Sequence, residues 1–137
     1  MTYDEIKKNK EICECLRKGD ENLGVLGYTD HSAVHCTMVA KRAAYILKKF
    51  GYSEEDIELV KIAGFMHEIG NVVNRKHHAE YGAILANEIL KKTDMSMKDR
   101  ITVVSAIGHH DESTGGATDP VSAALIIADK TDVRRNR

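Results

Sequence analysis

Histidine and acidic residues interrupt several apolar stretches of this chain. The segment "FMHEIGN", residues 65–71, places His67 and Glu68 side by side where the surrounding residues suit a buried helix. His35 interrupts "AVHCTMVA" in the same way, and Asp129 interrupts "ALIIADK". An unpaired carboxylate or imidazole is costly to bury, so these four groups need a partner that neutralises them together.

A divalent cation is such a partner. Two imidazoles and two carboxylates supply nitrogen and oxygen ligands without a thiolate, a set that favours Mn, Fe, Ni, Zn or Mg over a structural zinc site. Taken singly, each such residue is more often a hydrogen-bonded or half-exposed side chain than a metal ligand. All seven histidines of the chain, however, lie between positions 31 and 110, and this clustering in the sequence calls for a test of whether they also lie close together in space.

The elements that must position these residues are predicted to be helices. The chain has one proline, and apolar residues recur at helical spacing along most of its length. Ser53 and Ser96, each followed by an acidic residue three positions on, and Asp119 before Pro120 are typical of helix starts. Gly19 is expected to cap the first helix. The predicted helices cover 3–19, 30–51, 53–67, 78–92, 96–110 and 119–132.

Two segments are compatible with strands as well as with helices. Both "ITVVSAI" and "AALIIA" contain enough β-branched residues for buried strands. The capping signals before each segment and the lack of hairpin turns favour helices. We therefore expect an all-α fold, a single-domain bundle of about six helices.

The composition of the whole chain limits the class of protein. A length of 137 residues suits one domain, and 42% apolar with 30% charged residues is typical of a soluble globular protein. The net charge of −1 gives no evidence for nucleic-acid binding beyond the short basic end "RRNR". The chain lacks the apolar run of a membrane span or signal peptide, and its three cysteines lack C-x-x-C spacing. We therefore expect a cytoplasmic protein that does not contact a membrane.

The order of the four interrupting residues resembles the HD-domain superfamily of metal-dependent phosphohydrolases. That superfamily has a histidine on an early helix, an adjacent His-Asp pair on a later one and a distant aspartate. Here "HCTMVA" begins at His35, "HEIGN" contains His67 and Glu68, and "IADKTD" contains Asp129. The resemblance covers about residues 30–132 and implies that the chain is one HD-like domain in which these four residues bind a metal.

The remaining histidines resemble those of the subgroup named HD-GYP. The segment "HAEYGAIL" begins at His78, and "HHDE" begins at His109 and includes His110. The resemblance implies that His78, His109 and His110 hold a second metal beside the first. The expected cofactor is therefore one or two divalent ions.

The chain departs from the superfamily pattern at three places. Glu68 stands where the superfamily usually has aspartate, so its carboxylate reaches further by one methylene. Asn71 stands where a lysine often follows the pair, which removes a cation that could neutralise a phosphate oxygen. The loop 111–120 lacks the Gly-Tyr-Pro residues of the subgroup, so hydrolysis of cyclic di-GMP is not expected.

The resemblance implies an enzyme that hydrolyses a small-molecule phosphate mono- or diester, with nucleotides among the candidate substrates. A metal-activated hydroxide would attack phosphorus, and His67, Glu68 and Asp129 would be the catalytic residues. Positive or polar side chains near this site would contact the substrate. The candidates for this contact are His31, Lys130, Arg134 and Arg135. The alternative for His31 is an ordinary histidine at a helix end, and the alternative for the three basic residues is a solvated helix end whose positive charge suits the C-terminal dipole. The sequence leaves a homodimer open.

Two other classes of protein remain open at this point. One is a regulatory module that keeps the fold and binds a metal or nucleotide but has weakened catalysis, which the departures at Glu68 and Asn71 make plausible. The other is a helical interaction domain in which the histidines are incidental. Metal analysis discriminates against the second, and an assay with phosphate esters separates the enzyme from the regulatory module.

Overall fold

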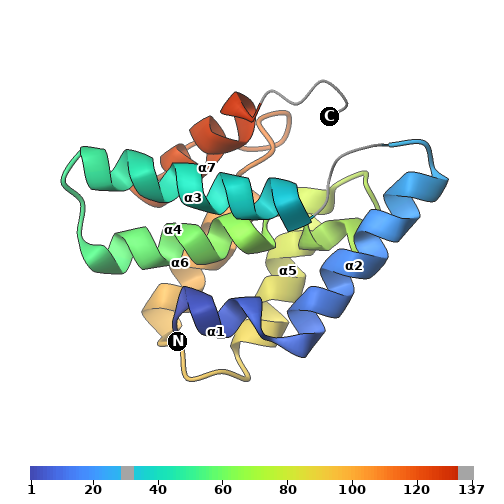
Figure 1. Ribbon diagram of the computed structural model, residues 1–137, viewed down its shortest axis with the longest axis horizontal. Helices are drawn as coiled ribbons and strands as arrows, with labels where there is room; N and C mark the ends of the chain where they lie inside the picture. The colour runs from blue at the N-terminus through green and yellow to red at the C-terminus, as the bar shows by residue number, and fades with distance from the viewer. Residues whose placement is uncertain (29–32, 133–137) are drawn as a thin grey trace.

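The described part of the chain, residues 1–28 and 33–132 of the computed structural model, is built from helices. It contains seven α-helices, one short 3-10 helix and no strand, which confirms the predicted all-α fold with one helix more than expected (Figure 1). In chain order these are α1 (Tyr3–Lys7), α2 (Lys10–Val25), α3 (Ala33–Lys49), α4 (Glu54–Met66), η1 (Ile69–Val72), α5 (His78–Leu90), α6 (Met97–Gly108) and α7 (Pro120–Thr131).

The predicted helix starts coincide with observed caps. The side chains of Ser53, Ser96 and Asp119 each accept a hydrogen bond from the backbone N–H three residues further on. Pro120 opens α7, where its missing N–H costs no helical hydrogen bond. Both segments that were compatible with strands belong to α6 and α7, so the capping signals indicated the right structure.

The prediction of one N-terminal helix over 3–19 is wrong. Asn9 caps a new helix by accepting a hydrogen bond at the start of α2, and so divides the segment into α1 and α2. Gly19 does not end α2 but lies buried inside it, where α2 packs against η1. A Cβ at position 19 would lie 3.2 Å from the Cβ of Asn71. The glycine therefore permits a close helix contact and does not act as a cap.

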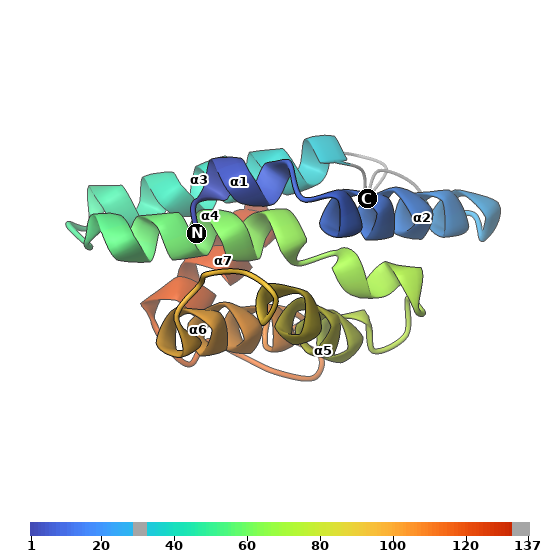
Figure 2. The ribbon, with the colours of Figure 1, turned by 90° about the horizontal axis from the view of Figure 1, so that it is seen from below.

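The antiparallel pair α3 and α4 forms the centre of the fold (Figure 1). In Figure 2 this pair lies above α5 and α6, while α7 packs against both α3 and α4. A Cβ added to Gly64 of α4 would lie 2.8 Å from the Cα of Ala40 in α3, so the two helices approach at a distance that only glycine allows. Because the helices run in opposite directions, the first turn of α3 and the last turn of α4 meet at one end of the core. Among the described residues, no helix is both long enough and apolar enough to span a membrane.

A second close approach joins η1 to α5. Gly70 faces the backbone of α5 so closely that a Cβ there would overlap the carbonyl group of His78. Gly82, one turn further along α5, is buried at the same contact. This contact holds the start of α5 beside the junction that follows α4.

Candidate metal centre

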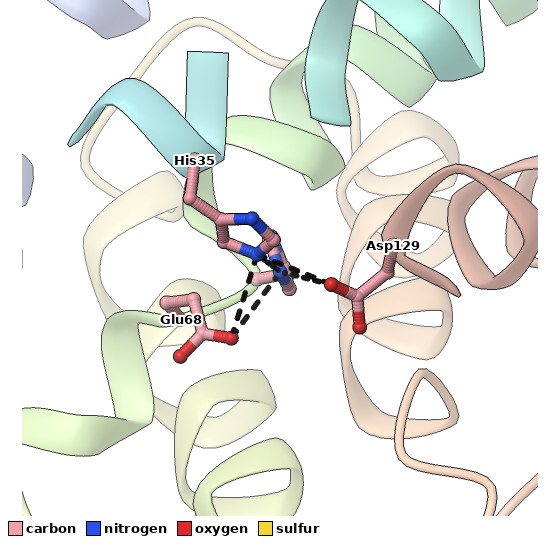
Figure 3. A group of neighbouring side chains, drawn as sticks. His35, Glu68 and Asp129 are labelled. Carbon is pink, nitrogen blue, oxygen red and sulfur yellow. Dashed lines mark hydrogen bonds and ion pairs between the residues drawn. The ribbon is translucent and has the colours of Figure 1, made fainter. Parts of the chain in front are cut away.

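Four side chains from separate segments converge at the end of the core. His35 lies in the first turn of α3, His67 and Glu68 form the junction between α4 and η1, and Asp129 lies in the last turn of α7. Figure 3 shows His35, Glu68 and Asp129 directed toward one another. Both histidines and the glutamate are buried, and Asp129 is partly exposed. The sequence-predicted set of four is therefore one cluster in space, which we call the first group.

The distances within the first group suit one metal ion. His35 Nε2 lies 3.1 Å from Asp129 Oδ1 and 3.2 Å from His67 Nε2. Glu68 Oε1 lies 3.3 Å from His67 Nε2 and 4.0 Å from His35 Nε2, and His67 Nε2 lies 3.5 Å from Asp129 Oδ1. Ligands about 2.1 Å from a common ion are about 3.0 to 3.4 Å apart in octahedral or tetrahedral geometry. The group could hold an ion with only small movements.

The other ring nitrogens of the two histidines are already engaged. His67 Nδ1 donates to the backbone carbonyl of Gly64 at 2.6 Å, and His35 Nδ1 donates to Asp132 Oδ2 at 2.6 Å. A carbonyl oxygen can only accept, so the Nδ1 of His67 carries the hydrogen and Nε2 is left as the ligand atom. Such hydrogen bonds orient metal-binding histidines and raise their basicity.

The electrostatics of the first group favour a positive charge at its centre. Burial alone would lower the pKa of His67, but the carboxylates of Asp129 and Glu68 outweigh burial and raise it to about 10. Without a metal cation, a proton on Nε2 of His67 must lie between the imidazoles and carboxylates that face one another. A divalent ion would satisfy the same atoms more completely, so the donor set fits a metal.

A second group adjoins the first and shares Glu68 with it. It consists of Glu68, His78 at the start of α5 and His110 just after α6, all of them buried. The Nε2 atoms of His78 and His110 lie 3.2 Å apart. Their Nδ1 atoms donate to the backbone carbonyls of Arg75 and Ile107, at 3.0 and 2.7 Å. This arrangement again turns the two Nε2 lone pairs toward a common point.

The histidines of the second group are held neutral. Burial lowers the pKa of His78, and burial with the nearby charge of His67 lowers that of His110 to about 4. Neutral imidazoles present lone pairs, which is the state that a metal requires. The two groups together could hold two neighbouring ions with Glu68 between them.

The outer oxygen of Glu68 is fixed by two residues that follow it in the chain. Glu68 Oε2 accepts hydrogen bonds from Asn71 Nδ2 and from Arg75 Nη1, the latter at 2.9 Å. Arg75 Nη1 also donates to Asn71 Oδ1 at 3.1 Å, which closes a triangle of three side chains. Asn71 is uncharged at a position where the superfamily often has a lysine, but Arg75 brings a positive guanidinium group to the carboxylate of Glu68.

A cavity of about 260 Å³ opens beside both groups. Glu68 and Asp129 line it from the first group, and His78 and His110 line it from the second. The other lining residues are Arg75, Asp111, Glu112, Ser113, Ile126 and Lys130. A small anionic molecule in this cavity would touch both candidate metal positions.

The remaining predicted site residues have different positions. His109 joins neither group of the described residues, and its buried Nδ1 has no hydrogen-bond partner among them. Lys130 lines the cavity, and its ammonium group pairs with Glu112 Oε1 at 2.8 Å. His31, Arg134 and Arg135 lie outside the described residues.

Two residues of the site were missed by sequence reasoning. Asp132 lies three positions after Asp129, about one helical turn away, and that spacing could have suggested a second carboxylate facing the same site. Arg75 lies in the connection between η1 and α5 and gave no periodic signal.

The fold and the geometry define a class: an all-α bundle with two adjoining clusters of histidines and carboxylates at one end of its core. Residues 33–134 match the family model of the HD domain. The chain belongs to the HD-domain family, which is part of a superfamily of metal-dependent hydrolases. The resemblance noted in the sequence is thereby confirmed.

Relatives and a solved structure extend this comparison. The chain is 30% identical to an uncharacterized protein of Methanocaldococcus jannaschii, over all of this chain and 61% of that protein. It is 31% identical over 104 residues to ribonuclease Y of Enterococcus faecalis, which is 74% of this chain and 18% of that enzyme. The chain therefore spans less than two thirds of either curated relative.

A solved structure with a similar fold is that of a predicted HD superfamily hydrolase from an uncultured Thermotogales bacterium. Its TM-score is 0.67 at 22% sequence identity, over 95% of this chain and 73% of the other. At this identity the likeness concerns the fold, and it supports an HD-like arrangement of the helices.

Proposed function

We propose that this protein is a cytoplasmic phosphohydrolase that cleaves a phosphate mono- or diester, such as a nucleotide, with one or two divalent metal ions. The observation that carries the proposal is the pair of ligand groups that share Glu68 on the wall of one cavity. Membership of the HD-domain family agrees with this chemistry.

The residues divide into holders of the metal and contacts for the substrate. His35, His67, Glu68 and Asp129 would hold the first ion, and Glu68, His78 and His110 would hold the second. When bound, such ions lower the pKa of a water molecule and neutralise the charge that develops on phosphoryl oxygens. Lys130, His31, Arg134 and Arg135 remain proposed substrate contacts, and His109 remains a proposed ligand.

The chain itself prepares the site in two ways. Hydrogen bonds to Asp132 and to backbone carbonyls fix the imidazole rings, so the ligand atoms need little reorganisation when an ion enters. The acidic wall of the cavity, formed by Glu68, Asp111, Glu112 and Asp129, repels an anionic ester until metal ions compensate its charge. Metal binding should therefore precede binding of the phosphate ester.

The proposal is tested with protein that has been stripped by a chelator and reloaded with Mn²⁺. We expect hydrolysis of p-nitrophenyl phosphate, bis(p-nitrophenyl) phosphate or a nucleotide only after reloading, and loss of activity in His67→Ala. A short RNA belongs in the same screen because one relative is named a ribonuclease. Activity that is equal with and without metal would contradict the proposal.

A regulatory module is the second candidate. The replacement of the usual aspartate by Glu68 and of the usual lysine by Asn71 favours it. This candidate predicts that the reloaded protein binds Mn²⁺ and a nucleotide but releases no phosphate from any ester in the screen.

A further inference from the structure

Arg75 occupies a distinct position in the wall of the cavity. Its side chain comes from the connection between η1 and α5 and is about a quarter exposed, with 26% of its surface accessible. The guanidinium group is anchored on one side by the hydrogen bonds of Nη1 to Glu68 Oε2 and Asn71 Oδ1. Glu68 belongs to both ligand groups, so Arg75 lies immediately beside the candidate metal positions.

The anchoring leaves part of the guanidinium group available to a ligand. Arginine has five N–H donors in one plane, and the hydrogen bonds that Arg75 makes within the described part of the chain all start at Nη1. The donors on Nε and Nη2 remain for a molecule in the cavity that Arg75 lines. Because Asn71 and Glu68 hold the plane of the group, these donors are oriented before a ligand arrives, which reduces the entropy lost on binding.

The other cation of the cavity is less suited to this role. Lys130 is exposed, and its ammonium group is paired with Glu112. The cavity also contains the carboxylates of Asp111 and Asp129, so an anionic ligand needs a fixed positive group. Among the described lining residues, Arg75 meets this need best because it is partly buried and held by two hydrogen bonds.

We propose that Arg75 binds the phosphoryl oxygens of the substrate and thereby supplies the cation that Asn71 removes from its own position. This inference rests on the proposed function and adds a specific residue to it. The ligand class is a phosphate group with at least two non-bridging oxygens, which match two parallel N–H donors of arginine.

The inference is tested by the binding of inorganic phosphate to the Mn²⁺-saturated protein, measured by isothermal titration calorimetry. We expect Arg75→Gln to raise the dissociation constant for phosphate by about tenfold to a hundredfold, the effect of losing hydrogen bonds to a charged group. Arg75→Lys keeps the charge but not the planar pair of donors, and should lie between the wild type and Arg75→Gln.

A matched control is available in Arg100. This arginine also donates to an asparagine side chain, that of Asn87, but it lies near the start of α6, at the other end of that helix from His110. Arg100→Gln should leave the dissociation constant for phosphate within about twofold of the wild type.

The outcomes separate this inference from the function on which it rests. A wild type that takes up no Mn²⁺ contradicts the proposed function. A wild type that binds Mn²⁺ and phosphate, with Arg75→Gln and Arg75→Lys both binding phosphate as tightly as the wild type, overturns the role of Arg75 alone. If Arg75→Gln cannot be loaded with Mn²⁺, the dissociation constant for phosphate is compared between Arg75→Lys and the wild type. Weaker binding by Arg75→Lys supports the role of Arg75, and equal binding overturns it.

Discussion

Glu68 uses its two carboxylate oxygens for different purposes. Oε1 faces the imidazoles of the first group, whereas Oε2 is bound by Asn71 and Arg75. The length of the glutamate side chain is what allows the carboxylate to span from this pair of donors to the ligand cluster. An aspartate has one methylene fewer and could satisfy one side only.

Replacing Glu68 by aspartate should therefore reduce activity, although aspartate is the usual residue of the family. We expect Glu68→Asp to lose about a hundredfold in kcat/KM, because a displacement of about 1 Å at a catalytic group has an effect of that order. The measurement is hydrolysis of the best ester from the screen at saturating Mn²⁺. Glu88→Asp, on the exposed face of α5, is the matched control. A gain of activity in Glu68→Asp would instead show a site that has decayed from the aspartate form.

Substitution of His110 can distinguish a site that holds two ions from a site that holds one. His110 belongs to the second group, and its Nε2 faces that of His78 at 3.2 Å. We expect His110→Ala to lower the number of bound Mn²⁺ ions from two to one while the first group stays loaded, as measured by elemental analysis of the purified protein. His77→Ala, which removes an exposed neighbour of His78, should leave the count unchanged. An unchanged count in His110→Ala would give the second group a structural role.

The residues of the first group could be predicted from the sequence because each interrupts an apolar stretch, and because their order resembles that of a known family. The position of Arg75 could not be predicted. It depends on the path of the connection after η1, and that path is set by the tight contact of Gly70 with α5. A glycine in a sequence shows that a close approach is allowed, but not which segment makes that approach.

At the scale of elements, the packing of α3 on α4 brings His35 and His67 together. Gly64 is the residue that permits this packing, since a Cβ there would meet the backbone of Ala40. The helices themselves were predictable because caps such as Ser53 and Ser96 are local signals. The role of Gly19 was not predictable, because a glycine at a buried contact with η1 cannot be distinguished in the sequence from a glycine that ends a helix.

Gly64→Ala tests this packing directly. The backbone of α3 must shift to admit the methyl group, so we expect a loss of about 1 to 3 kcal/mol in the free energy of unfolding by urea, together with weaker Mn²⁺ binding. Alanine has a higher helix propensity than glycine, but this gain of about 1 kcal/mol does not exceed the loss expected from the steric overlap. Gly24→Ala in α2 has open space around it and should be neutral or stabilising by up to about 1 kcal/mol. Equal effects of the two substitutions would mean that α3 and α4 tolerate a wider separation.

At the scale of the whole molecule, the first group ties together segments that are distant in sequence. Its four residues come from α3, from the junction after α4 and from α7, and all of these elements contribute to one core. An ion bound only by the folded chain stabilises that chain by RT ln(1 + [L]/Kd), so the stabilisation rises with the concentration of the free ion. Opening of the core should therefore become rarer when metal is present.

The reactivity of the Cys36 thiol measures how often the core opens. Cys36 follows His35 and is buried, and burial raises the pKa of its thiol well above the usual range, so the reactive thiolate is scarce while the protein is folded. We expect the exposed Cys13 to react with a thiol reagent at about pH 8 at once, and Cys36 only after unfolding. Mn²⁺ should slow labelling of Cys36 further and leave that of Cys13 unchanged, as followed by mass spectrometry. Rapid labelling of Cys36 in the native protein would contradict the buried position.

The place of Asp129 in α7 also determines when the first group can exist. Ribosomes release a chain from its N-terminus, so α3 and α4 emerge before α7. A nascent chain that includes His35, His67 and Glu68 still lacks Asp129, the fourth residue of the first group, and the core residues of α7. Any ion held by all four residues is thus acquired after translation has passed residue 129, from whatever metal the surrounding compartment then supplies.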